Sequence, residues 1–285
     1  MKGMEKKKAF VLMAALLFLP VLPATAEKGE IEIAYVQWAS AEAQTHITKI
    51  LLEEMGYDVT TRAVSAAVMW TGLAKGDVDL SVCAWLPYTH ENYWKRYGED
   101  VVDLGSVYEG ARIGLVVPTH VPIDSLDELT EHKEEFGGRI VGIEPGSGIM
   151  IHTREAAMPE YELEDWNLIS SSDPAMMAEL DRAVQRDEWI VITGWTPHWM
   201  WFAYDLKFLE DPENAYGEEE NIRAIGRKGF KEDFSEAAEF IESFCMNDDQ
   251  LGEVTYDINV NKTKPEQAAE KWVKENRDVV EKWLP

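Results

Sequence analysis

The chain has few basic residues and almost no cysteine. It carries 27 lysine and arginine residues against 53 aspartate and glutamate residues, a formal net charge of −26 over 285 residues. A protein this acidic repels phosphate backbones and anionic lipid surfaces, so a nucleic-acid partner is excluded. Two cysteines are too few for a fold held together by disulfides. With 46% hydrophobic and 11% aromatic residues, the chain can still bury a large core.

Long apolar runs are also scarce, and the one that stands out lies at the N-terminus. Residues 1–26 combine a lysine-rich start, an apolar run over 9–22 and Ala24-Thr25-Ala26, the order typical of a cleaved signal peptide. A membrane anchor would need about 20 apolar residues, whereas this run is shorter and contains Pro20. We therefore expect a signal peptide over 1–26, no lipid anchor there, and a mature protein that is soluble and periplasmic or otherwise extracytoplasmic.

The rest of the chain predicts alternating strands and helices. The expected strands are 31–38, 59–64, 80–84, 113–118, 139–143 and 189–194, and the expected helices are 43–55, 66–75, 148–157, 173–185, 234–244 and 265–284. This rhythm is typical of parallel sheets with helical crossovers, and so of the α/β class. We expect 27–117 to form the first part of lobe 1, 118–210 to form lobe 2, and 211–285 to return to lobe 1 and end in the C-terminal helices. The crossings are expected near residue 117 and between 206 and 222.

Two segments of the chain repeat one pattern. Residues 77–87 read DVDLSVCAWLP and residues 187–197 read DEWIVITGWTP. Each consists of acidic residues, an apolar strand, a small residue and Trp-x-Pro. The repeat predicts two similar lobes.

Three tryptophans and one glycine-rich loop come at the ends of expected strands. Trp38, Trp85, Trp195 and the loop 146–149 all come at strand ends, and Trp38 precedes Trp85 by the same distance as Gly148 precedes Trp195. Open α/β sheets present ligands at the carboxyl ends of their strands. If the two lobes face each other, these residues meet at one cleft.

The chemistry of that cleft indicates a zwitterionic ligand. Tryptophan is the strongest cation–π partner, and a quaternary ammonium has no N–H group with which to be recognised otherwise. The glycines before the helix expected at 148 expose backbone N–H groups at the positive end of a helix dipole, which favours an anion. His90 is a candidate for one further donor. A cation box beside an anion site fits a small betaine.

These same segments resemble the substrate-binding proteins of osmoprotectant ABC importers, the glycine betaine/proline betaine family. The resemblance covers almost the whole chain after the leader and is carried by LAKGDVDL (73–80), AWLPYTH (84–90), GIEPGSGIM (142–150) and TGWTPHWM (193–200). It implies the two-lobed periplasmic binding protein fold (type II), with the ligand in the interlobe cleft. It also implies delivery of the ligand to a membrane permease with ATPase subunits. No cofactor is expected, and we expect a monomer.

The resemblance also assigns roles to individual residues. It places the trimethylammonium group in a box of three tryptophans: Trp38, Trp85 and Trp195. It places the carboxylate on the backbone amides of Gly148 and Ile149 and on His90. Some relatives are circularly permuted, so the assignment of Trp38 depends most on its spacing. Some relatives are tethered by a lipidated cysteine, a pattern from which this leader departs.

The other tryptophans and the histidines have plainer interpretations. The tryptophans that fall inside expected elements indicate packing: Trp70, Trp94, Trp166, Trp189, Trp272 and Trp283. Trp199 and Trp201 follow the second Trp-x-Pro and are candidates for the rim of the site, and His198 is a weaker candidate for a ligand contact. Without the resemblance, the simpler interpretation of His90 is a helix-surface histidine. The six histidines are scattered without the spacing of metal ligands, so no metal is expected.

The two cysteines and the acidic clusters also have plain interpretations. Cys83 and Cys245 look like small core residues, and a bridge between them stays open because spacing does not decide it. Acidic runs such as 218–220 are typical of solvated surface. Such an excess of surface acid also suits a protein that works in high salt.

Three other functions compete with betaine binding. A hydrolase using Cys83 and His90 is the main rival, but the chain has no G-x-S-x-G motif, and we expect no enzyme. A second rival is a binding protein for choline, carnitine, ectoine or a sulfonium analogue. Choline has no carboxylate, so its site would not need the amides of Gly148 and Ile149 and would favour an acidic partner. A third, a periplasmic adaptor without a ligand, is disfavoured by the paired Trp-x-Pro segments.

Overall fold

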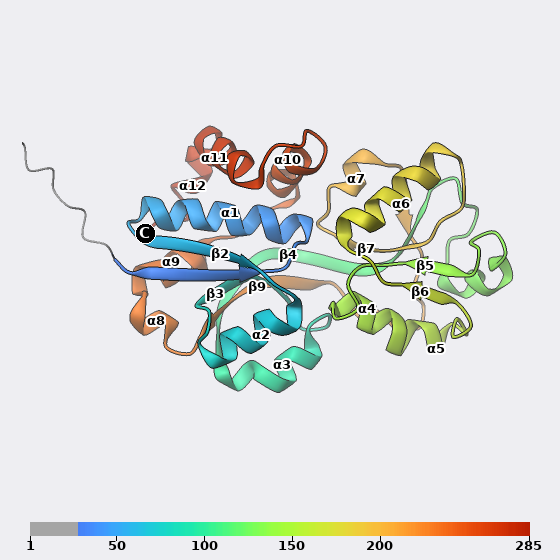
Figure 1. The fold of residues 1–285 in the computed structure, drawn as a ribbon, viewed down its shortest axis with the longest axis horizontal. Helices are drawn as coiled ribbons and strands as arrows, with labels where there is room; N and C mark the ends of the chain where they lie inside the picture. Colours follow the sequence, from blue (N-terminus) through green and yellow to red (C-terminus); the bar gives the residue numbers. More distant parts are fainter. Residues whose placement is uncertain (1–27) are drawn as a thin grey trace, which may run out of the picture.

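The computed structural model describes residues 28–285, so the predicted signal peptide lies outside the described residues. The strands follow one path in the order β2-β1-β3-β9-β4-β7-β5-β6, and β8 pairs with β4 beside this path. Figure 1 shows a lobe on either side of the middle of β4, with helices on both faces of each sheet. We call the part built on β1, β2, β3, β9 and the start of β4 the first lobe. The second lobe contains the rest of β4 and β5 to β8.

The bounds of the elements are as follows. The strands are β1 (Glu30–Tyr35), β2 (Asp58–Ala63), β3 (Leu80–Leu86), β4 (Val101–Pro118), β5 (Arg139–Val141), β6 (Asn167–Ile169), β7 (Ile192–Thr196), β8 (Leu206–Phe208) and β9 (Glu220–Arg227). The α-helices are α1 (Ala39–Glu54), α2 (Ala66–Lys75), α3 (Glu91–Tyr97), α4 (Gly148–His152), α5 (Met158–Glu160), α6 (Asp173–Gln185), α7 (Met200–Ala203), α8 (Phe230–Asp233), α9 (Ser235–Ser243), α10 (Asp248–Asn259), α11 (Pro265–Glu275) and α12 (Arg277–Val280). Short 3₁₀ helices are η1 (Gly98–Asp100) and η2 (Leu126–His132), and a π-helical turn, η3 (Thr153–Ala157), joins α4 to α5.

The first lobe confirms the predicted parallel pairing and adds an antiparallel strand. β1 pairs in parallel with β2 and β3, as the crossovers through α1 and α2 require. β9 lies between β3 and β4 and runs antiparallel to both. Helix α1 packs against α10 and α11 on one face of the sheet, whereas α2 and α3 lie together on the other (Figure 1).

The long strand β4 belongs to both lobes. It pairs with β9 from Val101 to Ala111, and from Arg112 onward it pairs with β7 and β8. Gly110, beside this change of partner, has a φ of 80°, which only glycine adopts freely. The chain therefore changes sheets ahead of the crossing expected near residue 117. In the second lobe, β5 pairs in parallel with β6 and β7.

Several expected boundaries were wrong, and three of them bear on the site and on the C-terminal helices. β3 continues to Leu86 and β7 to Thr196, so Trp85 and Trp195 lie within the last residues of their strands rather than beyond them. The predicted C-terminal helix over 265–284 breaks at Asn276, whose φ of −117° and ψ of 38° are not helical. The side-chain amide of Asn276 donates instead to the carbonyl of Trp272 at 3.0 Å, a local bond that competes with continued helix.

Packing in the first lobe accounts for several predicted core residues. The rings of Trp272 and Trp283 stack with centroids 6.0 Å apart, and both are buried. Cys83 is buried, but Cys245 is exposed, so its interpretation as a core residue was wrong. Both thiols are free, and no Cys83–Cys245 bridge forms in the described chain. Within residues 28–285, no helix is both long and apolar enough to cross a membrane.

Candidate ligand-binding site

Residues from both lobes enclose one small buried cavity. Its walls are Trp38, Trp85, Thr89, Ile113, Ile143, Ser147, Gly148, Ile149 and Trp195. The volume of this cavity is about 20 Å³. The three tryptophans are only 3–5% exposed. The structure therefore brings together five of the six predicted site residues, with His90 the exception.

Trp38 lies between β1 and α1 and is held by the second lobe. Its indole Nε1–H donates to Oε1 of Glu144 at 2.6 Å, and Glu144 lies in the segment between β5 and α4. Burial raises the pKa of Glu144 above its ordinary value, and the hydrogen bond from Trp38 acts in the opposite direction. This hydrogen bond fixes the indole plane across the boundary between the lobes.

Trp195 is held by the segment that follows it. Its carbonyl accepts a hydrogen bond from the indole of Trp201 at 2.8 Å. The ring of His198 meets the Trp195 ring nearly at right angles, with centroids 4.8 Å apart. The Nε1–H of Trp195 is buried and has no hydrogen-bond partner among the described residues. Trp201 is not one of the wall residues, and through its hydrogen bond to Trp195 it supports the cavity from outside.

The start of α4 approaches the first lobe closely because residue 148 is glycine. A Cβ atom at this position would lie 2.2 Å from the carbonyl oxygen of Thr89 and 2.4 Å from its Cγ2. The first turn of a helix leaves backbone N–H groups without intrahelical partners. Gly148 and Ile149, the first two residues of α4, both line the cavity, so these groups lie at its wall.

His90 lies behind the cavity and is fully buried, so the helix-surface interpretation was wrong. Its Nδ1 accepts hydrogen bonds from the backbone N–H of Trp85 at 3.1 Å and from the indole of Trp70 at 3.4 Å. Burial lowers the pKa of His90 to about 3. The ring is therefore neutral, and the hydrogen-bond network assigns its proton to Nε2. That buried nitrogen has no partner within the described chain, and the ring centroid lies 5.8 Å from that of Trp38.

Sequence reasoning missed several wall residues. Thr89 and Ser147 adjoin predicted residues, so their position was a usable signal. Ile113 and Ile143 had none, because an isoleucine in a strand looks the same whether it faces the core or a cavity. Trp70 was expected only to pack, yet it also donates to His90.

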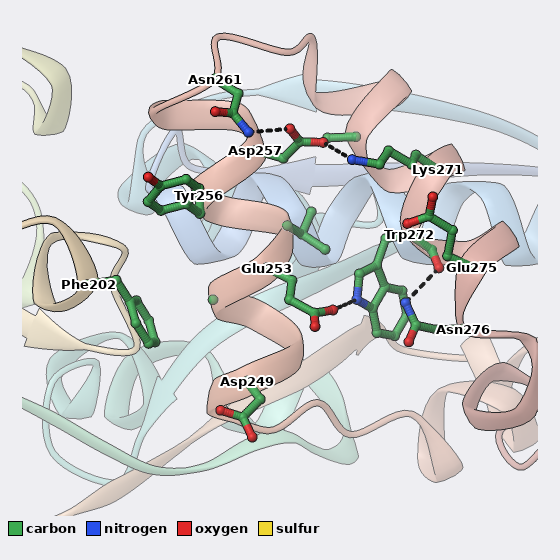
Figure 2. A pocket seen from close by; sticks show the side chains of 13 residues that line it. Phe202, Asp249, Glu253, Tyr256, Asp257, Asn261, Lys271, Trp272, Glu275 and Asn276 are labelled. Carbon is green, nitrogen blue, oxygen red and sulfur yellow. Dashed lines mark hydrogen bonds and ion pairs between the residues drawn. The ribbon is translucent and has the colours of Figure 1, made fainter.

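A larger cleft of about 800 Å³ lies elsewhere, between Phe202 of α7 and the helices α10 and α11. Figure 2 shows that several of its polar side chains turn toward one another: Asp257 accepts from Lys271, and Glu253 accepts from the indole of Trp272. Groups that are already paired with each other offer little to a ligand. The tryptophan-lined cavity, with its unpartnered donors, is the stronger candidate site.

Within the part of the chain that the structure describes, the groups needed for metal binding or thiol chemistry are not assembled. Across residues 28–285, no three histidine, cysteine or acidic side chains lie close enough together to hold a metal ion. The Sγ of Cys83 is 3.3 Å from Oγ of Ser81 and 3.4 Å from Sδ of Met69. Burial raises the pKa of the Cys83 thiol, which disfavours the thiolate that a nucleophile needs.

Comparison with known proteins gives consistent matches. The model of the family described as the substrate-binding domain of ABC-type glycine betaine transport systems matches residues 29–275. The chain is 43% identical over 167 residues to the glycine betaine/carnitine transport binding protein GbuC of Listeria monocytogenes. That match covers 58% of this chain and 54% of GbuC, so it spans about half the length of this relative.

Two solved structures are similar over nearly the whole chain. Lactococcal OpuAC, in its closed-liganded conformation complexed with glycine betaine, is 38% identical with a TM-score of 0.85. That likeness covers 90% of this chain and 100% of the other. The glycine betaine/L-proline-binding protein ProX from Borrelia burgdorferi is 33% identical with a TM-score of 0.86, covering 90% of this chain and 97% of the other.

Proposed function

The chain belongs to the family of substrate-binding domains of ABC-type glycine betaine transport systems, and from this premise we propose that it captures glycine betaine for uptake. The family serves transport rather than catalysis, and its members work outside the cytoplasm with permease partners. The two-lobed periplasmic binding protein fold expected from the sequence is confirmed. The observation that carries the proposal is a cavity whose wall combines three tryptophans, far apart in the chain, with the start of α4.

The tryptophan box suits the trimethylammonium group. Trp38, Trp85 and Trp195 reach the cavity from three separate segments and are nearly excluded from water. Desolvation strengthens the attraction of a cation to an aromatic face, and each contact contributes about 0.5–2 kcal/mol. We assign the methylated nitrogen to these three rings.

The start of α4, together with His90 behind the cavity, suits the carboxylate. Gly148 and Ile149 bring first-turn amides of α4 to the cavity. Buried donors are normally hydrogen-bonded, so the unpartnered Nε2–H of His90 fits a ligand acceptor. We assign the carboxylate to these three donors.

The composition of the wall favours a zwitterion over choline. Choline is a cation without a carboxylate of its own, so its site would favour an acidic side chain. None of the nine residues that form the wall of this cavity, all within residues 28–285, is acidic. Glu144 accepts a hydrogen bond from the indole N–H of Trp38, but it does not line the cavity. Betaine, with its own carboxylate, needs no such partner. Proline betaine has the same two groups and is included in the proposal.

Binding proceeds by capture and closure. A ligand cannot reach rings that are 3–5% exposed unless the lobes separate. Contacts made in the closed form shift the hinge equilibrium toward closure. We place the hinge at the partner change in β4 and at the segment between β8 and β9. The closed form then docks on a permease driven by ATPase subunits. We also propose that the mature protein starts after Ala26 and acts as a monomer.

Calorimetry of the purified mature protein tests this function. Glycine betaine and proline betaine should bind with saturation, and choline and carnitine should bind more weakly. Quenching or shifting of indole fluorescence on titration would locate binding at tryptophan. Tighter binding of choline than of glycine betaine would contradict the assignment, and no binding of either betaine would overturn the function.

A further inference from the structure

Helix α1 has no capping side chain of its own. It begins at Ala39, and the residue before it, Trp38, makes no side-chain cap bond. The backbone N–H of Ala39 donates instead to Oδ2 of Asp173 at 3.1 Å. A carboxylate is favoured at a helix N-terminus by the unpaired N–H groups and by the helix dipole. Asp173 begins α6, so the second lobe supplies the cap of a helix in the first lobe.

Burial of Asp173 depends on very few partners. The residue is 5% exposed, and no lysine or arginine among residues 28–285 forms an ion pair with it. Its other partner is His198, whose Nε2 lies 3.2 Å and 3.3 Å from the two carboxylate oxygens. A buried carboxylate is tolerated only when it is hydrogen-bonded. The N–H groups of Ala39 and His198 therefore allow Asp173 to lie between the lobes.

His198 connects this carboxylate to the tryptophan box. Its Nδ1 accepts a hydrogen bond from the backbone N–H of Met200 at 3.1 Å, so the ring proton lies on Nε2 and is donated to Asp173. The same ring meets Trp195 edge to face, with centroids 4.8 Å apart. One imidazole thus holds a box tryptophan and orients the carboxylate that caps α1.

We propose that Asp173 and His198 are positioning residues that couple the two halves of the box. The contacts run without a gap from Trp195 to His198, then to Asp173, and then to the start of α1 beside Trp38. The proposal rests on the proposed function of capture and closure. When the lobes separate, α1 loses its cap and Asp173 loses the Ala39 N–H. The cap therefore stabilises only the closed form and slows release of the ligand.

Two substitutions in the mature chain test the coupling from opposite sides. Asp173→Asn removes the charge at the helix terminus. Ala39→Pro removes the N–H at the first helical position, where proline is well accommodated, and Trp38 is already extended with φ of −97° and ψ of 145°. The control is Asp181→Asn, which lies on the same helix and bonds Tyr204 and Gln185 within the second lobe.

The measurements are the Kd for glycine betaine by calorimetry, the dissociation rate by stopped-flow indole fluorescence, and the melting temperature without ligand. Both test variants should bind about 10-fold more weakly, chiefly through faster dissociation. The ligand-free melting temperature of Ala39→Pro should match the wild type, because the cap is absent from the open form, whereas Asp173→Asn also alters the hydrogen bond to His198 within the second lobe. Asp181→Asn should bind as the wild type does.

Failure of the coupling and failure of the function give different results. If the wild type binds and both variants keep its Kd and dissociation rate, the coupling is overturned and the function stands. A matching loss of ligand-free stability in both variants would make the contact structural and would also overturn the coupling. If the wild type binds no betaine, the function fails, and the coupling, which rests on that function, is overturned with it.

Discussion

Replacing Gly148 with alanine should block closure of the lobes. The added Cβ would lie 2.2 Å from the carbonyl oxygen of Thr89, a backbone atom that cannot rotate away. Thr89 is also fixed in place, because its backbone N–H and its hydroxyl both donate to Glu220. The two segments must then separate by roughly 1 Å, and overpacking of this kind costs about 1–3 kcal/mol.

This strain should appear in binding rather than in folding. Thr89 and Gly148 lie on different lobes, so opening of the hinge relieves the clash without unfolding either lobe. The affinity for glycine betaine should therefore fall by about 5- to 150-fold. The ligand-free melting temperature should stay at the wild-type value. The backbone of Gly148 is not in the left-handed region, so no conformational strain adds to the effect.

The matched control lies two positions earlier in the same loop. A Cβ at Gly146 would meet nothing within 4 Å, so Gly146→Ala should bind glycine betaine as the wild type does. Both variants are compared by calorimetry and by thermal unfolding without ligand. Wild-type affinity in Gly148→Ala would refute the argument that space at this contact governs closure.

Three further predictions concern the box, a buried histidine and the surface charge. Trp195→Ala should weaken glycine betaine binding by about 1–3 kcal/mol in calorimetry, whereas Trp272→Ala should reduce stability alone; unchanged affinity in Trp195→Ala would remove it from the box. The pKa of His90 is lowered to about 3, so below about pH 6.5 the unfolded chain binds a proton that the folded chain does not. The free energy of unfolding should therefore fall by about 1.4 kcal/mol per pH unit from this group as the pH drops toward 3. Urea unfolding of the ligand-free protein at pH 7 and pH 5 should show a steeper loss in wild type than in His90→Gln, and equal slopes would contradict this. The net charge of −26 predicts a melting temperature that rises from low to molar NaCl as repulsion is screened, and indifference to salt would show that the acidity has another cause.

The local parts of the fold could be predicted from the sequence. Helix α2 has its predicted bounds because Ser65 caps its start and Gly76 ends it in the left-handed conformation. The parallel pairing of β1, β2 and β3 follows from the crossover helices between them. The place of β9 between β3 and β4 could not be predicted, because that pairing joins residues far apart in the chain and leaves no local pattern.

Likewise, only part of the candidate site could be predicted from the sequence. Trp85 and Trp195 were recognisable from the repeated Trp-x-Pro segments, and Gly148 from its glycine-rich loop. The role of Asp173 was hidden, because an acid at the start of a helix is an ordinary capping choice for its own helix. Here it caps a helix in the other lobe, which only the three-dimensional arrangement reveals.

The sharing of β4 between both sheets means that the molecule cannot be cut cleanly in two. Cutting the chain between residues 111 and 112 would leave β9 in the C-terminal fragment with β7, away from β3 and from the first half of β4, with which it pairs. Each fragment would carry a bare backbone edge, ready to pair with another copy. The strand β4, about which the two lobes move, therefore also requires them to fold as one polypeptide.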